Sequence, residues 1–224
     1  MEILISQGHA PPPNPGGATV VIDVIRAFTT AHHAFLGGVR DIQLVASADE
    51  ALRRKQSQPQ LLLSGEVDAL PIAGFDFGNS PYEISQADLN GRTLVQRTTN
   101  GVIATLAAQH SDVVLVAALV NAAATARWLL AQNYTRILLV ASHPSGDEDV
   151  ACAEYMRGLL GGTGISLAEA SRRTIEASAA QKFLQGEHPH LRAADIHMAA
   201  TEDPNARPLR VSYQPQPTVH LVTA

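Results

Sequence analysis

Five apolar, strand-like runs in this sequence each end in polar, charged or hydroxyl residues of the kind that bind phosphate. The polar residues that follow these runs lie at 23–26, 64–66, 97–101, 121 and 142–149. In an open α/β sheet, neighbouring strands share the edge formed by their carboxyl ends, and ligands bind in the crevice there. We therefore expect these segments, which are far apart in the chain, to converge on one site.

Asp23 and Arg26 follow the first of these runs, at the predicted junction of a buried strand and a helix. The aspartate is suited to ligate a metal ion, and the arginine to a two-pronged contact with phosphate or carboxylate. The alternative is structural, with Asp23 capping the helix and Arg26 as its ion-pair partner. The pattern of aspartyl-phosphate phosphatases is not met, because Ile25 and Ala27 stand where these carry a second aspartate and a hydroxyl; attack by water and a covalent phospho-enzyme both stay open.

The second cluster joins Glu66, at a strand end, to the glycine-rich segment 74–81. Long ordered loops in compact domains are usually functional. This loop carries Asp76, Asn79 and Ser80. Its amides and hydroxyl can form an anion nest, and the proline that ends it suits the first turn of a short helix facing an anion. The alternative is an ordinary turn with a helix cap.

The third cluster is the run Arg97, Thr98, Thr99, Asn100 and Gly101 between a strand and a helix. Two hydroxyls, a side-chain amide and a glycine in this position could cradle an oxyanion. The run is not a Walker loop, because no Gly-x-x-x-x-Gly-Lys precedes it. Threonine capping the helix is the alternative reading.

Three consecutive acids, Asp147, Glu148 and Asp149, begin a predicted helix after the fifth run. They could simply complement the helix dipole. If they face the same crevice as the carboxylates of the first two clusters, they suit magnesium, which prefers oxygen ligands. His143, at the strand end beside them, is a candidate for proton transfer.

Short runs rich in Val, Ile and Leu alternate with helical patterns, which predicts an α/β fold with a largely parallel sheet. We expect strands near 18–23, 41–46, 60–64, 92–96, 112–117 and 135–141. We expect helices near 26–37, 47–57, 101–109, 121–132, 149–161 and 166–184. Two further strand-like segments, at 209–213 and 218–222, could form an antiparallel edge or cross to a partner chain, which makes a homodimer our expectation.

The composition excludes several classes of protein. A net charge of −5, without a block of Lys or Arg, argues against a nucleic-acid partner. The lone Cys152 fits a reducing compartment, and the first residues lack the features of a signal peptide. No run approaches the ~18 apolar residues of a membrane helix. We expect a cytoplasmic protein of one α/β domain over 1–224, with its motifs in 18–160.

The order of these motifs resembles that of the 2-phosphosulfolactate phosphatase family. That family shows Asp-Val-x-Arg-Ala-x-Thr-Thr, Gly-Glu, Gly-Phe-Asp-x-Gly-Asn-Ser-Pro, Thr-Thr-Asn-Gly, Asn-Ala and Glu-Asp-x-x-Cys-Ala. These are matched here by Asp23 to Thr30, Gly65-Glu66, Gly74 to Pro81, Thr98 to Gly101, Asn121-Ala122, and Glu148 with Asp149, Cys152 and Ala153. Val67 replaces an arginine of the family pattern, and Arg97, in place of a threonine, offers another anion-binding arginine.

The resemblance implies a magnesium-dependent hydrolase with a three-layer α/β/α fold. Such an enzyme removes phosphate from a small sulfonated 2-hydroxy acid, giving sulfolactate and phosphate; in methanogens this reaction serves coenzyme M synthesis. We expect the metal ligands among Asp23, Glu66, Asp76 and Asp149, with Arg26 and Glu148 completing the catalytic set. We expect the substrate to be held by Asn79, Ser80, Arg97, Thr98, Thr99, Asn100, Gly101 and Asn121. The alternatives are a phosphatase of another small 2-hydroxy acid and a non-catalytic anion-binding protein.

Overall fold

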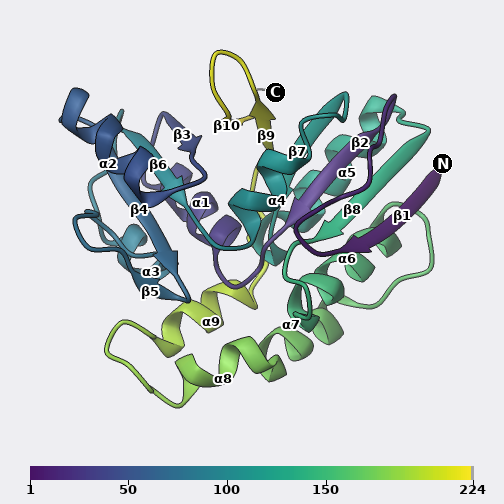
Figure 1. Ribbon diagram of the computed structural model, residues 1–224. Coiled ribbons are helices and arrows are strands. Elements are labelled where there is room, and N and C mark those ends of the chain that lie inside the picture. Colours follow the sequence, from purple (N-terminus) through teal and green to yellow (C-terminus); the bar gives the residue numbers. More distant parts are fainter. Residues whose placement is uncertain (223–224) are drawn as a thin grey trace.

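The computed structural model describes residues 1–222, and its backbone is organised around one ten-stranded sheet (Figure 1). The strands lie in the order β1-β8-β2-β7-β9-β10-β3-β6-β4-β5. Helices cover the sheet, which confirms the predicted α/β class with a mixed, mostly parallel sheet between helical layers.

The first half-sheet consists of four parallel strands. These are β1 (Glu2–Gln7), β8 (Arg136–Ala141), β2 (Ala18–Ile22) and β7 (Val113–Ala117). All five residues of β2 are buried, because the strand is central and covered on both faces. This explains why its sequence is a continuous apolar run rather than an alternating one.

The second half-sheet consists of three parallel strands and a short antiparallel one. These are β3 (Asp41–Leu44), β6 (Thr93–Arg97), β4 (Leu62–Val67) and β5 (Leu70–Pro71). The segment between β4 and β6 holds a short helix, α3 (Pro81–Ser85), whose N-cap is the Ser80 hydroxyl. The proline therefore occupies the first helical turn, as predicted.

The C-terminal hairpin joins the two half-sheets at the centre of the sheet. Its strands are β9 (Leu209–Ser212), which pairs with β7, and β10 (Thr218–Leu221), which pairs with β3. The prediction that these strands form an edge or cross to a partner chain is wrong. Their apolar, β-branched residues belong to the core, which a local pattern cannot distinguish from an edge position.

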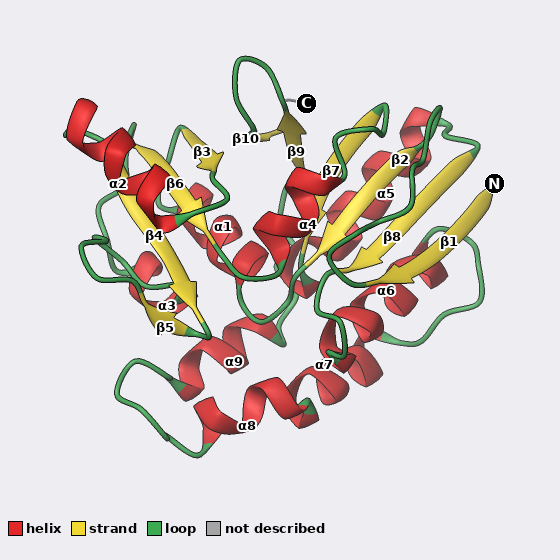
Figure 2. Ribbon diagram, in the orientation of Figure 1, coloured by secondary structure: helices red, strands yellow, loops and turns green. Residues whose placement is uncertain are grey.

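Three successive antiparallel pairings separate β7 from β3, so the two half-sheets run in opposite directions along the sheet. Their carboxyl ends nevertheless converge, because the sheet twists and bends steeply at the hairpin. Figure 2 shows the arrowheads of β2, β8, β4 and β6 all pointing toward the lower centre of the molecule. The expected convergence is thus present, but it arises from this bend and not from one shared parallel edge.

Helices lie on both faces of the sheet and below it. Those that cover the faces are α1 (Ala27–Leu36), α2 (Ala48–Ser57), α4 (Gly101–Ala107), α5 (Ala122–Gln132) and α6 (Asp147–Leu159). In Figure 1, α5 and α6 lie behind β2, β8 and β1, whereas α4 lies in front. Three helices close the molecule below the converging strand ends: α7 (Leu167–Glu176), α8 (Ser178–Leu184) and α9 (Ala193–Ala199).

Three further features differ from the sequence-based expectations. Strand β1 was not predicted, because its partly exposed residues form an edge. The single helix expected at 166–184 is two helices, since Ala177 adopts an extended ψ of 143° between them. Helix α9 was also missed. No helix in residues 1–222 is long and apolar enough to span a membrane.

The central position of the hairpin can be tested at two adjacent residues. Val219 is fully buried between β9 and β3, whereas its neighbour His220 is exposed. We expect Val219→Ala to lower the free energy of unfolding by about 2 kcal/mol, because it opens a cavity in the core. His220→Ala should change it by less than about 0.5 kcal/mol. Equal effects of both variants in denaturant titrations would contradict this placement.

Candidate active site

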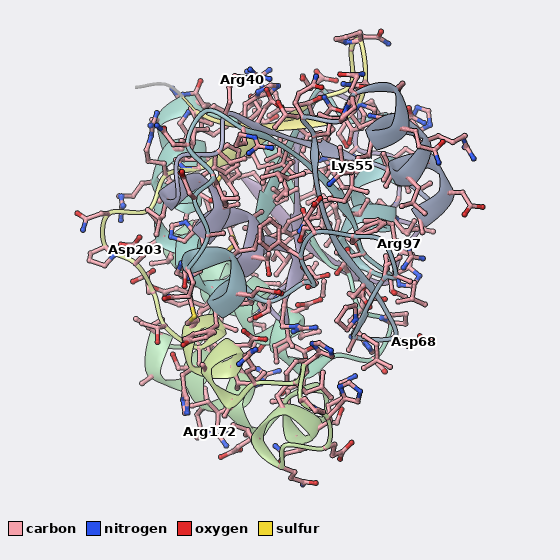
Figure 3. The ribbon with its side chains drawn as sticks, turned by 90° about the vertical axis from the view of Figure 1, so that its left-hand side faces the viewer. Arg40, Lys55, Asp68, Arg97, Arg172 and Asp203 are labelled. Atoms are coloured by element: carbon pink, nitrogen blue, oxygen red, sulfur yellow. The ribbon has the colours of Figure 1, made fainter. Side chains whose placement is uncertain are left out.

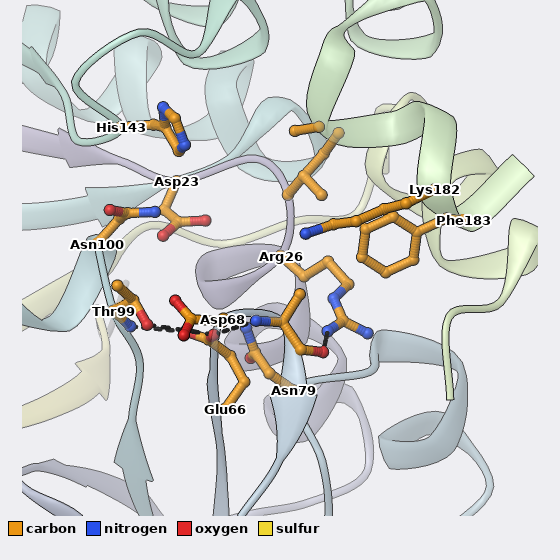
Figure 4. A pocket seen from close by; sticks show the side chains of 13 residues that line it. Asp23, Arg26, Glu66, Asp68, Asn79, Thr99, Asn100, His143, Lys182 and Phe183 are labelled. Atoms are coloured by element: carbon orange, nitrogen blue, oxygen red, sulfur yellow. Dashed lines mark hydrogen bonds between the residues drawn. The ribbon is translucent and has the colours of Figure 1, made fainter. Parts of the chain in front are cut away.

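A cavity of about 260 Å³ lies where the carboxyl ends of the two half-sheets meet (Figure 4). Drug-sized ligands occupy pockets of about 300–1,000 Å³, so this one suits a small metabolite. Its wall carries Asp23, Ile25, Arg26, Glu66, Asp68, Ala69, Asn79, Thr99, Asn100, His143, Ala179, Lys182 and Phe183. Six residues of the predicted site therefore line one cavity: Asp23, Arg26, Glu66, Asn79, Thr99 and Asn100.

The Asp23 carboxylate connects the two half-sheets at this cavity. One oxygen accepts a hydrogen bond from the amide of Ala27 (3.0 Å), at the start of α1, and the other from the amide of Gly101 (2.8 Å), at the start of α4. A Cβ on Gly101 would lie 2.6 Å from this carboxylate, so only glycine permits the approach. The capping role weighed for Asp23 is thus present, together with a place in the cavity wall.

A second buried carboxylate, Asp149, lies next to Asp23. It accepts hydrogen bonds from the amide of Val24 (2.8 Å), the amide of His143 (3.0 Å) and the hydroxyl of Ser142 (3.2 Å). It therefore fixes the chain directly after both β2 and β8.

The three consecutive acids at the start of α6 point in different directions. Asp147 is exposed and pairs with Arg173, which lowers the pKa of this carboxyl. Glu148 and Asp149 are buried, and Glu148 Oε2 has no hydrogen-bond partner among the described residues 1–222. The helical repeat thus turns two of the three acids inward.

Burial makes the inward carboxylates weak acids. It raises the pKa of Asp23 from its ordinary value of 3.8 to about 6, although the amides of Ala27 and Gly101 oppose the shift. Burial, with the negative charges of its two neighbours, raises the pKa of Asp149 well above 3.8. Burial likewise raises the pKa of Glu148. Positive charge placed among these three groups would stabilise their ionised forms.

The Glu66 carboxylate organises the cavity wall of the second half-sheet. It accepts hydrogen bonds from the amide (2.6 Å) and hydroxyl (3.2 Å) of Thr99 and from the amide of Ala69 (2.7 Å). These contacts join the end of β4 to the loop after β6 (Figure 4). Gly65 is required beside it, because a Cβ there would lie 2.2 Å from the Arg97 carbonyl oxygen.

Arg26 is held in the cavity wall by Asp195, a residue that the sequence did not single out. Their buried side chains form an ion pair of 2.8 Å, and Asp195 also accepts a hydrogen bond from the Ser80 hydroxyl (2.6 Å). The guanidinium lies 4.5 Å from the centre of the Phe183 ring and donates to the Ala69 carbonyl (3.0 Å). Arg26 and Asp195 are 169 positions apart, so no local pattern could reveal the pair.

Eight predicted site residues do not line this cavity: Glu148, Asp149 and Gly101 belong to the cluster around Asp23, and the other five are held elsewhere. The Asp76 carboxylate pairs with Lys55 and accepts from the amide of Leu63 (2.7 Å). Figure 3 shows Lys55 well away from Asp68, which lines the cavity, so we correct the expectation that Asp76 is a metal ligand.

The other four have structural partners. Arg97 donates to the Glu66 carbonyl (2.5 Å), and the Thr98 hydroxyl accepts from the amide of Val102 (3.1 Å) in α4. Ser80 caps α3, and Asn121 is fully buried, with its side chain bonded to the amide of Ala118. These four residues therefore have supporting roles in the fold, and their contact with substrate stays a prediction.

The donors around Asp23 suit a divalent cation by their chemistry. Asp23, Asp149 and Glu148 offer carboxylate oxygens, which magnesium prefers, and one of those oxygens has no partner within residues 1–222. Within the same residues, no group of three or more His, Cys, Asp and Glu side chains is already arranged around a metal position.

The fold and this cavity, in which two cationic side chains lie with carboxylates at strand ends, define the class: an α/β protein with a charged pocket of metabolite size. Residues 5–198 match the family described as 2-phosphosulpholactate phosphatase. The chain belongs to this family.

Three relatives carry the name "Probable 2-phosphosulfolactate phosphatase". The protein of Bacillus subtilis is 44% identical over 199 residues, which is 88% of this chain and 87% of that protein. The protein of Deinococcus radiodurans is 41% identical over 70% of this chain and 66% of its own length. The protein of Gloeobacter violaceus is 32% identical over 70% of both chains.

The role of Asp195 can be tested by removing it. Asp195→Ala leaves the Arg26 charge buried without its partner, so we expect a loss of about 3–5 kcal/mol in the free energy of unfolding. Glu169→Ala, which breaks an exposed ion pair with Arg172, should leave the denaturation midpoint unchanged. Comparable midpoints for both variants would show that the buried pair does not stabilise the fold.

The raised pKa of Asp23 predicts a pH-dependent stability in the presence of a chelator. Folding raises this pKa above its unfolded value, so the contribution of Asp23 to stability is full below about pH 4 and is lost as the pH rises through 6. The Asp23→Asn variant does not lose stability in this way, because its side chain does not ionise. We expect its free energy of unfolding relative to wild type to increase by roughly 3 kcal/mol between pH 4 and 8.

The comparison between these two proteins is the informative measurement. Burial lowers the pKa of His33 to about 4, which changes stability in the opposite direction over this range but affects both proteins equally. A difference between wild type and Asp23→Asn that is independent of pH would contradict the shift.

Proposed function

We propose that this protein is a magnesium-dependent phosphomonoester hydrolase that converts 2-phosphosulfolactate to sulfolactate and phosphate. Membership of the family and the names of its relatives support this activity. The observation that carries the proposal is the buried carboxylate cluster at the ends of β2 and β8, of which Asp23 lines a cavity of metabolite size.

Asp23 and Asp149 are the proposed metal ligands of the first half-sheet, and Glu66 is that of the second. Asp76 is no longer included, because Lys55 and the amide of Leu63 hold its carboxylate elsewhere. When bound, magnesium supplies positive charge that offsets the charge of the phosphoryl oxygens. The raised pKa values of Asp23 and Asp149 support the proposal, since a cation among them relieves their mutual repulsion.

Polar groups of both half-sheets would orient the phosphate. Thr99 and Asn100 line the cavity beside Glu66, and the Asn79 side chain lines it next to Arg26. Asn79 is buried, and its side-chain Nδ2 is the atom that would donate to the phosphate, because the Oδ1 only accepts. Arg26 is preoriented by Asp195 and retains further N–H groups for an anion.

His143 is the proposed proton-transfer residue, which would pass a proton from water to the leaving alkoxide. Its Nδ1 accepts a hydrogen bond from the amide of Ser145 (3.1 Å), so the neutral ring carries its proton on Nε2. The ring lines the cavity, whereas Glu148 does not. This difference favours His143 over Glu148, the other candidate.

We further propose that the enzyme acts in the cytoplasm as a homodimer. Cys152 is free and buried, which fits a reducing compartment. The strands first expected to reach a partner pair within the chain, so the dimer now rests on exposed apolar residues such as Leu36 and Leu130. Light scattering would measure the oligomeric state. A place for the reaction in coenzyme M synthesis stays a prediction.

The activity is tested by measuring phosphate release from 2-phosphosulfolactate and 2-phospholactate, with magnesium and with a chelator. We expect magnesium-dependent release that is fastest with the sulfonated substrate. Release only from 2-phospholactate or a related acid would indicate a different 2-hydroxy acid phosphatase. Binding of these anions without turnover would indicate a non-catalytic protein on the same scaffold.

A matched pair of variants tests the role of Asp23. Asp23→Asn keeps the size of the side chain but removes the charge, so we expect at least a ~100-fold loss of kcat/KM, or about 3 kcal/mol of transition-state stabilisation. Asp49→Asn, at an exposed position of α2, should retain wild-type activity. Full activity of Asp23→Asn would remove this residue from the mechanism.

A further inference from the structure

Lys182 reaches the cavity from α8, in a part of the chain to which no family motif could be assigned. Figure 4 shows its side chain extending from the helix with the nitrogen directed toward the wall that carries Asp23 and Glu66. The chain has only two lysines, Lys55 and Lys182. Lys182 therefore places an uncommon side chain opposite the carboxylates.

The other cations near the site already have partners. The Arg26 guanidinium pairs with Asp195 and donates to the Ala69 carbonyl. Lys55 pairs with Asp76, outside the cavity. Within residues 1–222, no acceptor lies within hydrogen-bond distance of the Lys182 ammonium. Its nitrogen lies 5.8 Å from the centre of the Phe183 ring.

Helix α8 packs against neighbouring segments of the chain, and this packing fixes the position of Lys182. Ala180 and Phe183 of α8 are buried against Leu191 and Ile196, which form a small core separate from that of the sheet. Lys182 lies on the same helix but lines the cavity. The fold thus holds a charged group in a partly enclosed space. An ammonium loses part of its hydration there, and a bound anion would compensate for that loss.

We propose that Lys182 binds the second anionic group of the substrate, its sulfonate or its carboxylate, while the phosphate lies against the wall of Asp23 and Glu66. This inference rests on the proposed function and identifies what selects a doubly anionic acid. The two charged ends of such a substrate then meet opposite walls of one cavity. An ammonium is a compact charge with three donors, so it suits an oxyanion without requiring planar geometry.

The kinetic test compares Lys182→Ala with two other variants. We expect KM for 2-phosphosulfolactate to rise about 10- to 100-fold in Lys182→Ala, the range for a hydrogen bond to a charged group, with kcat within a few-fold of wild type. Lys182→Arg should restore most of the affinity. Lys55→Ala, which removes the same charge outside the cavity, should leave KM unchanged.

The second substrate identifies the group that Lys182 binds. If KM for 2-phospholactate is unaffected by Lys182→Ala, the partner is the sulfonate; if both KM values rise equally, it is the carboxylate. KM values within twofold of wild type for both substrates would overturn the inference. A fall in kcat with unchanged KM would also overturn it, because Lys182 would then act on the chemical step.

A binding measurement separates this inference from the proposed function. Absence of phosphate release by the wild-type protein overturns the function, but calorimetry with sulfolactate still tests Lys182. At least tenfold weaker binding by Lys182→Ala supports the inference. Equal affinity of the two proteins, or no binding to wild type, overturns it.

Discussion

The site depends on one carboxylate that is shared by two helix starts. Asp23 follows the central strand of the first half-sheet and accepts the amides of Ala27 and Gly101, the latter from the helix that follows β6 of the second half-sheet. Two half-sheets that run in opposite directions are thereby joined at their carboxyl ends. The same oxygens face a cavity, so the group that closes the fold also supplies its negative charge. Burial of that charge is unfavourable, and it raises the pKa of Asp23 above its ordinary value.

The charges around the cavity are separated in space. Buried carboxylates lie at the ends of β2 and β4, whereas Arg26 and Lys182 lie on the side of α8 and α9. Asp195 neutralises Arg26 and fixes its direction, but Lys182 has no such partner among residues 1–222. This asymmetry explains how a chain with a net charge of −5 can bind a small anion. The positive charges of Arg26 and Lys182 lie at the cavity itself.

The strand ends were predictable because apolar runs and the polar residues after them form a local signal. The prediction placed Asp23, Glu66, Thr99 and Asn100 correctly in one cavity wall. It failed for Asp76, whose partner Lys55 lies 21 positions away on another element. Arg97 and Ser80 were similarly suited to phosphate by type. In the fold, one Arg97 nitrogen donates to the Glu66 carbonyl and the Ser80 hydroxyl donates to the Asp195 carboxylate, partners that only the folded chain brings near.

The sequence by itself determined the class of fold, most of its strands and helices, the family, and the set of strand ends that carry chemistry. Tertiary structure decided the rest: the hairpin at the centre of the sheet, the closure of the cavity by α8, and the pairing of Arg26 with Asp195. The physical reason is the distance along the sequence between the residues in contact. Helix and strand patterns act over a few residues, whereas contacts that span most of the chain leave no periodic trace in the sequence.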